Sequence, residues 1–280
     1  MIKLDQKLIV YDSNCKVCSS AKDVVLKLTS IPEEKIIAFK DLSGELTSRV
    51  DPEKFRNVMA LIDTAGGQTI YGSEGVAHIF SSQYRIARFI FQFAFIRKMF
   101  DFCYKTQAYN RYIIAMPKSQ FACDCFPDKV AKYRISYIAF TIVFSALLTV
   151  WLGISLKPFF QISSAEAATQ MLLIAGSGWV LQILLACAIL KQKALDYVGH
   201  LGSIMVVGLV VLIPWMLVHS LTGLATPYLP ALNIAASSGI MLWLHIQRSR
   251  YLGLSQLWTA TWFILLQSTA AYWIYTFHIK

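Results

Sequence analysis

Two closely spaced pairs of cysteines are the residues of this chain best suited to chemistry. Cys15 and Cys18 form a Cys-x-x-Cys motif, and Cys123 and Cys125 form a Cys-x-Cys pair much later in the chain. A dithiol exchanges electrons with a disulfide through a mixed disulfide, whereas four thiolates bind zinc. Six cysteines without a recognisable signal peptide favour redox or metal chemistry in a reducing compartment over a disulfide framework.

The residues around the first pair predict a strand, a turn and a helix. Residues 7–12 (KLIVYD) form an apolar run typical of a buried strand, and residues 21–28 are amphipathic. Cys15 then stands at a helix N-terminus, where the helix dipole and free N–H groups lower the pKa of its thiol. We expect Cys15 to attack, and Cys18, buried one turn behind it, to resolve the mixed disulfide. Asp12 either accepts the proton of Cys18 or orients the turn.

The motif resembles that of the DCC family of predicted thiol-disulfide oxidoreductases, which carry Asp-x-x-Cys-x-x-Cys directly after the first strand. The resemblance extends to about residue 130 and includes YGSEGVAHIF (71–80) and YKTQAYNRY (104–112). It implies a thioredoxin-like α/β domain with thiol-disulfide oxidoreductase activity. The chain departs from the pattern at Ser13, where the family usually has Gly. It also lacks a proline just before the strand predicted at 57–63, which puts thioredoxin-style peptide binding in doubt.

The rest of the first domain fits that plan. Strands are predicted at 36–42, 57–63 and 68–72, with a helix at 73–80, giving the order β-α-β-α-β-β-α. Two aromatic helical segments follow in residues 84–111, and two interpretations of them stay open. In one interpretation the segments pack on the sheet. In the other they lie in a membrane interface, with the apolar Phe89, Phe93 and Ile96 in the bilayer and the basic Arg85, Arg88, Arg97 and Lys98 at the headgroups.

Beyond this domain the chain is too apolar for one soluble globule, because 56% of all residues are hydrophobic and they concentrate after Arg134. We therefore predict a domain at 1–131 and an all-α transmembrane bundle at 132–280. Runs of about one bilayer thickness predict about five spans, at 135–156, 169–190, 198–221, 229–246 and 254–277.

Charge near the spans predicts the orientation. AKYR precedes the first span, KQK follows the second and RSR follows the fourth, whereas the alternate loops carry at most Lys157. The positive-inside rule then gives a multi-pass protein of the cell (inner) membrane with a cytosolic N-terminal domain. We interpret the net charge of +10 as favouring the lipid bilayer, and not nucleic acid, as a partner.

Two further groups are candidates for redox partners. Cys123 and Cys125 either relay electrons to the first pair or join it as zinc ligands, although the spacing matches no common zinc ribbon. His200 and His245 lie near the predicted cytosolic ends of two spans and are weak candidates for a quinone or haem site.

The sequence is interpreted as a membrane-anchored thiol-disulfide oxidoreductase with a membrane or cytosolic redox partner. The alternatives are a zinc-binding or redox-sensing module that regulates or assembles a membrane partner, and the accessory domain of a small transporter. Few polar residues are expected in mid-span, which speaks against transport.

Overall fold

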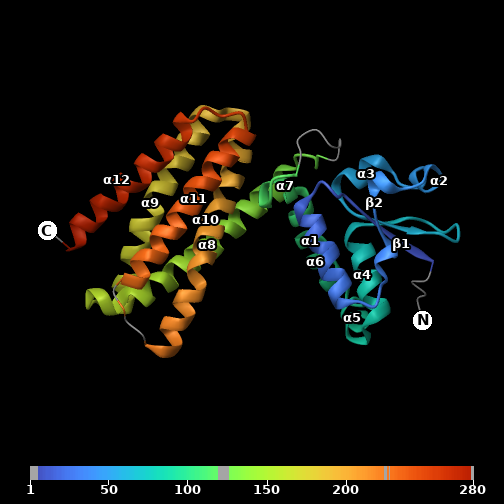
Figure 1. Cartoon of the computed structure of the whole chain (residues 1–280), viewed down its shortest axis with the longest axis horizontal. Helices are drawn as coiled ribbons and strands as arrows, with labels where there is room; N and C mark the ends of the chain where they lie inside the picture. Colours follow the sequence, from blue (N-terminus) through green and yellow to red (C-terminus); the bar gives the residue numbers. More distant parts are fainter. Residues whose placement is uncertain (1–5, 119–125, 224–225, 227, 279–280) are drawn as a thin grey trace. The chain divides into compact units, whose positions relative to one another are not determined.

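The computed structural model describes residues 6–118, 126–223, 226 and 228–278, and the chain divides into two compact units. The first, Met1–Tyr137, is an α/β domain, and the second, Ile138–Lys280, is helical (Figure 1). The domain boundary predicted after residue 131 falls at the start of helix α8 (Ala131–Phe160), whereas the two units divide inside that helix.

The first unit is built on a four-stranded mixed sheet in the order β2-β1-β3-β4. Strand β1 pairs in parallel with β2 and antiparallel with β3, and β3 pairs antiparallel with β4. This arrangement confirms the predicted thioredoxin-like α/β plan. The strands are β1 (Lys7–Tyr11), β2 (Ile36–Ala38), β3 (Ala60–Asp63) and β4 (Ile70–Tyr71). The helices are α1 (Lys16–Leu28), α2 (Gly44–Thr47), α3 (Pro52–Asn57), α4 (Gly72–Gln83), α5 (Arg85–Ile90), α6 (Ala94–Tyr109) and α7 (Arg111–Ile114).

Both faces of the sheet are buried, which explains the continuous apolar run in β1. Successive strand side chains point to opposite faces. Leu8 and Val10 pack into one cluster with Phe55 of α3, whereas Ile9 packs into another with Ile79 of α4. The strand that opens the cysteine motif is therefore held from both sides.

The second strand is shorter than the prediction of 36–42. It ends at Ala38, and Phe39–Asp41 forms a 3-10 turn. Phe39 stacks on Phe55 with ring centroids 4.5 Å apart. This tertiary contact occupies the side chain that would otherwise continue the strand pattern.

Within the described residues, the second unit contains four long helices and most of a fifth, α8. Successive helices run in opposite directions (Figure 1). They are α8 (Ala131–Phe160), α9 (Ser164–Leu190), α10 (Ala194–Thr222), α11 (Tyr228–Tyr251) and α12 (Leu257–His278). Each predicted span falls on one of them. In the part of the chain that the structure describes, three helical stretches are long and apolar enough to cross a membrane: Ala131–Phe160, Ser164–Thr222 and Tyr228–Tyr251. The middle stretch contains both α9 and α10, and the number of spans stays a prediction.

Candidate functional site

The first cysteine pair lies where β1 passes through a turn into α1. Cys15 and Cys18 form a disulfide. Cys15 is the N-cap of α1, and its Sγ accepts a hydrogen bond from the backbone N–H of Cys18 at 3.0 Å. An N–H group aimed at this sulfur from a helix N-terminus stabilises a thiolate when the disulfide opens.

The burial of the two cysteines differs from the prediction. Cys15 is fully buried at 0% exposure, whereas Cys18 is partly exposed. The expectation that Cys18 lies buried behind Cys15 is therefore wrong. A long-range contact adjoins the cysteine turn, because the backbone N–H of Lys118 donates to the carbonyl oxygen of Asn14.

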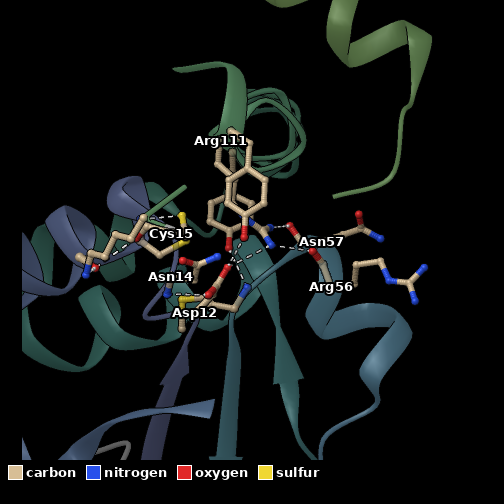
Figure 2. The surroundings of a disulfide bond; sticks show 12 residues. Asp12, Asn14, Cys15, Arg56, Asn57 and Arg111 are labelled. Carbon is tan, nitrogen blue, oxygen red and sulfur yellow. Dashed lines mark hydrogen bonds and ion pairs between the residues drawn. A yellow bond between two sulfur atoms is a disulfide. The ribbon is translucent and has the colours of Figure 1, made fainter. Parts of the chain in front are cut away.

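Asp12 is the centre of a buried polar cluster beside the disulfide (Figure 2). Its Oδ1 accepts the backbone N–H of Asn14 at 2.9 Å, and its Oδ2 accepts the hydroxyl of Tyr112 at 2.9 Å. Arg111 Nη2 lies 3.7 Å from the same Oδ2. The carboxylate thus orients the cysteine turn, as one of the two sequence interpretations expected. Its part in proton transfer stays a prediction.

Arg111 connects this cluster to the end of α3. Its guanidinium donates to the carbonyl oxygens of Arg56 (2.7 Å) and Asn57 (3.0 Å). Carbonyls at a helix C-terminus attract a cation, so α3 helps to hold the buried Arg111 next to Asp12. Burial and the adjacent Asp12 carboxylate raise the pKa of Tyr112 well above its usual range, which keeps the phenol protonated as a donor.

A cavity of about 750 Å³ lies beside the exposed sulfur. It is mostly apolar, and its wall includes Asp12, Lys16 and Cys18 from the motif together with Phe100, Cys103 and Tyr104 from α6. Cys103 is an exposed free thiol. Because Cys18 borders the cavity and Cys15 is fully buried, a partner in the cavity has access to Cys18 but not to Cys15.

The backbone N–H just before β3 is hydrogen-bonded within the domain. The N–H of Met59 donates to the hydroxyl of Tyr104 at 3.2 Å. In thioredoxins a proline at this place receives the substrate backbone. The Met59–Tyr104 contact covers that position, in agreement with the doubt about thioredoxin-style peptide binding.

Cys123 and Cys125 lie outside the described residues, but the segments on both sides of them are anchored at the site. Lys118 binds Asn14, as noted above, and its Nζ donates to Ser19 Oγ at 3.2 Å. After the gap, the ring of Phe126 packs edge-on against Tyr112 with centroids 5.1 Å apart. The zinc alternative, which needs this second pair, remains open. Among the residues that can be described, no cluster of three potential ligands would hold a metal ion.

The two histidines proposed for a membrane cofactor have other partners. His245 Nε2 contacts Tyr197 Oη at 2.9 Å, and its Nδ1 contacts Thr259 Oγ1 at 3.0 Å. Both ring nitrogens of His245 are thus engaged, which does not fit an axial haem ligand. His200 Nδ1 lies 2.8 Å from Arg248 Nη1. A cavity of about 700 Å³ in this unit has neither histidine among its described lining residues.

Sequence reasoning identified the cysteines and Asp12 but missed Arg111, Tyr112 and Asn57. The signal was present in the YNRY run at 109–112, which the family resemblance included. Spacing alone does not reveal that these side chains meet Asp12, because Tyr112 is 100 positions away.

Comparison with known proteins agrees with the geometry. Residues 9–116 match the model of the DCC1-like thiol-disulfide oxidoreductase family. Searches of curated proteins and of solved structures give no significant match. The chain thus joins a domain similar to that family to helices apolar enough to enter a membrane.

Proposed function

We propose that this chain is a membrane-anchored thiol-disulfide oxidoreductase whose Cys15–Cys18 pair cycles between disulfide and dithiol. The observation that carries the proposal is the disulfide at the N-terminus of α1, with the Cys18 N–H directed at Cys15 Sγ. The match of this domain to the DCC1-like family supports it.

The reaction begins at the accessible sulfur. A partner thiolate attacks Cys18 Sγ, the Cys15–Cys18 bond breaks, and Cys15 leaves as a thiolate stabilised by the helix N-terminus. A second partner thiol, as thiolate, then attacks the mixed disulfide and releases Cys18. The partner becomes a disulfide, and two electrons and two protons pass to the Cys15–Cys18 pair. The opposite direction oxidises this pair and reduces a partner disulfide. This order reverses the roles that the sequence predicted for the two cysteines.

The proposed relay uses Cys123 and Cys125 as the partner dithiol within the same chain. Cys123 is five positions after Lys118, which is bound at Asn14. An extended chain of that length spans at most about 16–18 Å. Phe126, next to Cys125, is held against Tyr112. The contacts of Lys118 and Phe126, one on either side of this cysteine pair, support the proposed relay.

The domain is placed on the cytosolic face of the cell membrane, with the bilayer and a membrane or cytosolic redox protein as partners. The support is the distribution of basic residues, including Lys191 and Lys193 between α9 and α10 and Arg248 and Arg250 at the end of α11.

Redox titration of the purified full chain tests the proposed function. The chain is equilibrated in glutathione buffers of graded potential, its free thiols are alkylated, and the zinc content of the same sample is measured. We expect the Cys15–Cys18 peptide to convert from disulfide to dithiol in one two-electron transition, with Cys103, an exposed free thiol of the first unit, alkylated throughout. If the thiols resist alkylation until a chelator releases one zinc ion per chain, the metal-site alternative replaces the redox function.

A further inference from the structure

Helices α5 and α6 carry apolar side chains that the first unit leaves exposed. Ile86 and Phe89 lie on α5, Phe93 is the N-cap of α6, and Phe95, Met99 and Phe102 follow in α6. We call these six residues the α5–α6 apolar face. Phe95 is 75% exposed and Ile86 is 69% exposed. Apolar surface gathered in this way marks an interaction site and not an ordinary soluble surface.

The spacing shows that the exposed residues of α6 lie along one side of the helix. Phe95, Met99 and Phe102 are separated by four and three positions, which brings them onto one stripe. Phe93 joins this stripe to α5, because its ring lies edge-on to Phe89 with centroids 5.3 Å apart. The face is therefore long and narrow, as in a helix that lies flat in an interface.

Exposed cations accompany the apolar face. They are Arg85 and Arg88 on α5 and Arg97 and Lys98 on α6. No Asp or Glu occurs between residues 84 and 100. Apolar side chains next to several uncompensated cations complement a surface that is apolar inside and anionic at its edge, which describes the interface of an anionic phospholipid bilayer.

The C-terminal end of the face adjoins the start of a membrane-capable helix. Phe102 contacts the ring of Tyr133, with centroids 6.1 Å apart, and the Nζ of Lys132 lies 5.4 Å from the centroid of Phe102. Lys132 and Tyr133 belong to the first turn of α8, which is long and apolar enough to cross a membrane. Lys and Tyr are typical of the water interface of such a helix.

We propose that the α5–α6 apolar face lies in the interfacial layer of the bilayer, with Arg85, Arg88, Arg97 and Lys98 on anionic phospholipid headgroups. The proposal applies the interfacial interpretation of residues 84–111 to the exposed side of α5 and α6, while Tyr104 of α6 stays packed in the domain against Met59. It goes beyond the redox function, because α6 also forms part of the wall of the cavity beside Cys18. The docked face therefore holds the entrance to the cysteine pair at the membrane surface.

Photocrosslinking of the full chain in lipid nanodiscs tests this docking. A benzophenone amino acid replaces Phe95 or Met99, and replaces the exposed Glu45 of α2 as a matched control. The discs contain phosphatidylcholine alone or mixed with phosphatidylglycerol. We expect phospholipid adducts at Phe95 and Met99, at least about fivefold above Glu45, in the anionic discs. Equal yields at the three positions, or crosslinks to a second copy of the chain instead of lipid, overturn the proposal.

The cations are tested by a second variant. Arg97→Gln with Lys98→Gln is compared with Lys40→Gln, which removes an exposed cation elsewhere in the domain. Each cation near an anionic membrane shifts the docked-to-free ratio about fivefold. The double variant should therefore lose lipid adducts at Phe95 in anionic discs, whereas Lys40→Gln retains them. Unchanged adduct yield in the double variant contradicts the assignment of these cations to headgroups. Redox cycling of Cys15–Cys18 in each variant shows that the domain is folded.

Discussion

At the residue scale, the chemistry depends on which sulfur a partner meets first. Cys18 borders the cavity and is partly exposed, whereas Cys15 is buried and receives the N–H of Cys18. Cys15, at the helix N-terminus, is thus the better leaving thiolate, and Cys18 Sγ is the better point of attack. The proposed mechanism therefore gives the two sulfurs different tasks, in the opposite order to the one predicted from the motif.

Single-serine variants separate these tasks. In a background with the other four cysteines changed to serine, Cys15→Ser leaves Cys18 as the sole thiol, and Cys18→Ser leaves Cys15. Because only Cys18 borders the cavity, we expect glutathione disulfide to form a mixed disulfide several-fold faster with Cys15→Ser. Mass spectrometry of the adducts over time measures both rates. Faster adduct formation with Cys18→Ser would return the attacking role to Cys15.

Substitution of Tyr112 tests the polar cluster that supports the cysteine turn. Tyr112→Phe leaves the buried Asp12 carboxylate without one of its donors, which costs about 1–3 kcal/mol of domain stability. The apparent melting temperature of the purified chain should fall. Tyr109→Phe is the matched control, because the phenyl ring retains the stacking of Tyr109 on Tyr133. Equal losses in the two variants would contradict a specific role of the Tyr112 hydroxyl.

The stability that the Tyr112 hydroxyl contributes depends on pH. The folded state raises the pKa of Tyr112 above its ordinary value of about 10, through burial and the Asp12 carboxylate. A raised pKa means that the folded state holds the proton more tightly than the unfolded state. The stabilisation is therefore complete below about pH 10 and is lost as the pH rises above it. The difference in stability between the wild type and Tyr112→Phe should shrink in that alkaline range.

At the scale of elements, sequence patterns located the strands and helices well but not their ends or contacts. The apolar run in β1 and the amphipathic pattern of α1 depend on neighbours in sequence. By contrast, Phe39, which follows the end of β2 at Ala38, stacks on Phe55, and the cysteine turn is hydrogen-bonded by Lys118, so both places involve residues far along the chain. For the same physical reason Asp12 was predictable as a motif residue, whereas its partner Arg111 was not.

The packing of α9 against α12 provides a prediction about the helical unit. A Cβ atom at Gly178 of α9 would lie 2.7 Å from Leu266 Cα of α12, whereas one at Gly176 would meet nothing within 4 Å. Gly178→Ala must separate the two helices, and such overpacking costs about 1–3 kcal/mol. Gly176→Ala gains the same helix propensity without the clash.

Thermal stability in detergent distinguishes these two substitutions. We expect Gly178→Ala to melt below the wild type and Gly176→Ala to melt at or slightly above it. The hydrogen bond from Trp273 Nε1 to Ser177 Oγ (2.9 Å) ties α12 to the same part of α9, so the loss should remain local to this helix pair. Equal melting of the two variants would mean that α9 and α12 do not approach as closely as the structure shows.

At the scale of the whole molecule, the orientation in the membrane decides which redox pool the cysteines meet. A cytosolic domain faces a glutathione pool poised to reduce most disulfides, whereas the outer side is oxidising. In the proposed orientation, which rests on the positive-inside rule, the first unit and the α9–α10 turn lie in the cytosol and the connection between α8 and α9 lies outside.

Accessibility to a membrane-impermeant maleimide tests this orientation. Glu45→Cys reports on the first unit, and Ala165→Cys, in the first turn of α9, reports on the opposite side; both positions are exposed. In a background with the native cysteines changed to serine, we expect intact cells to label Ala165→Cys only, and inside-out vesicles to label Glu45→Cys only. The reversed pattern would place the Cys15–Cys18 pair in an oxidising compartment. The pair would then donate oxidising equivalents to thiols outside the cell, because reduction by cytosolic thiols would no longer reach it.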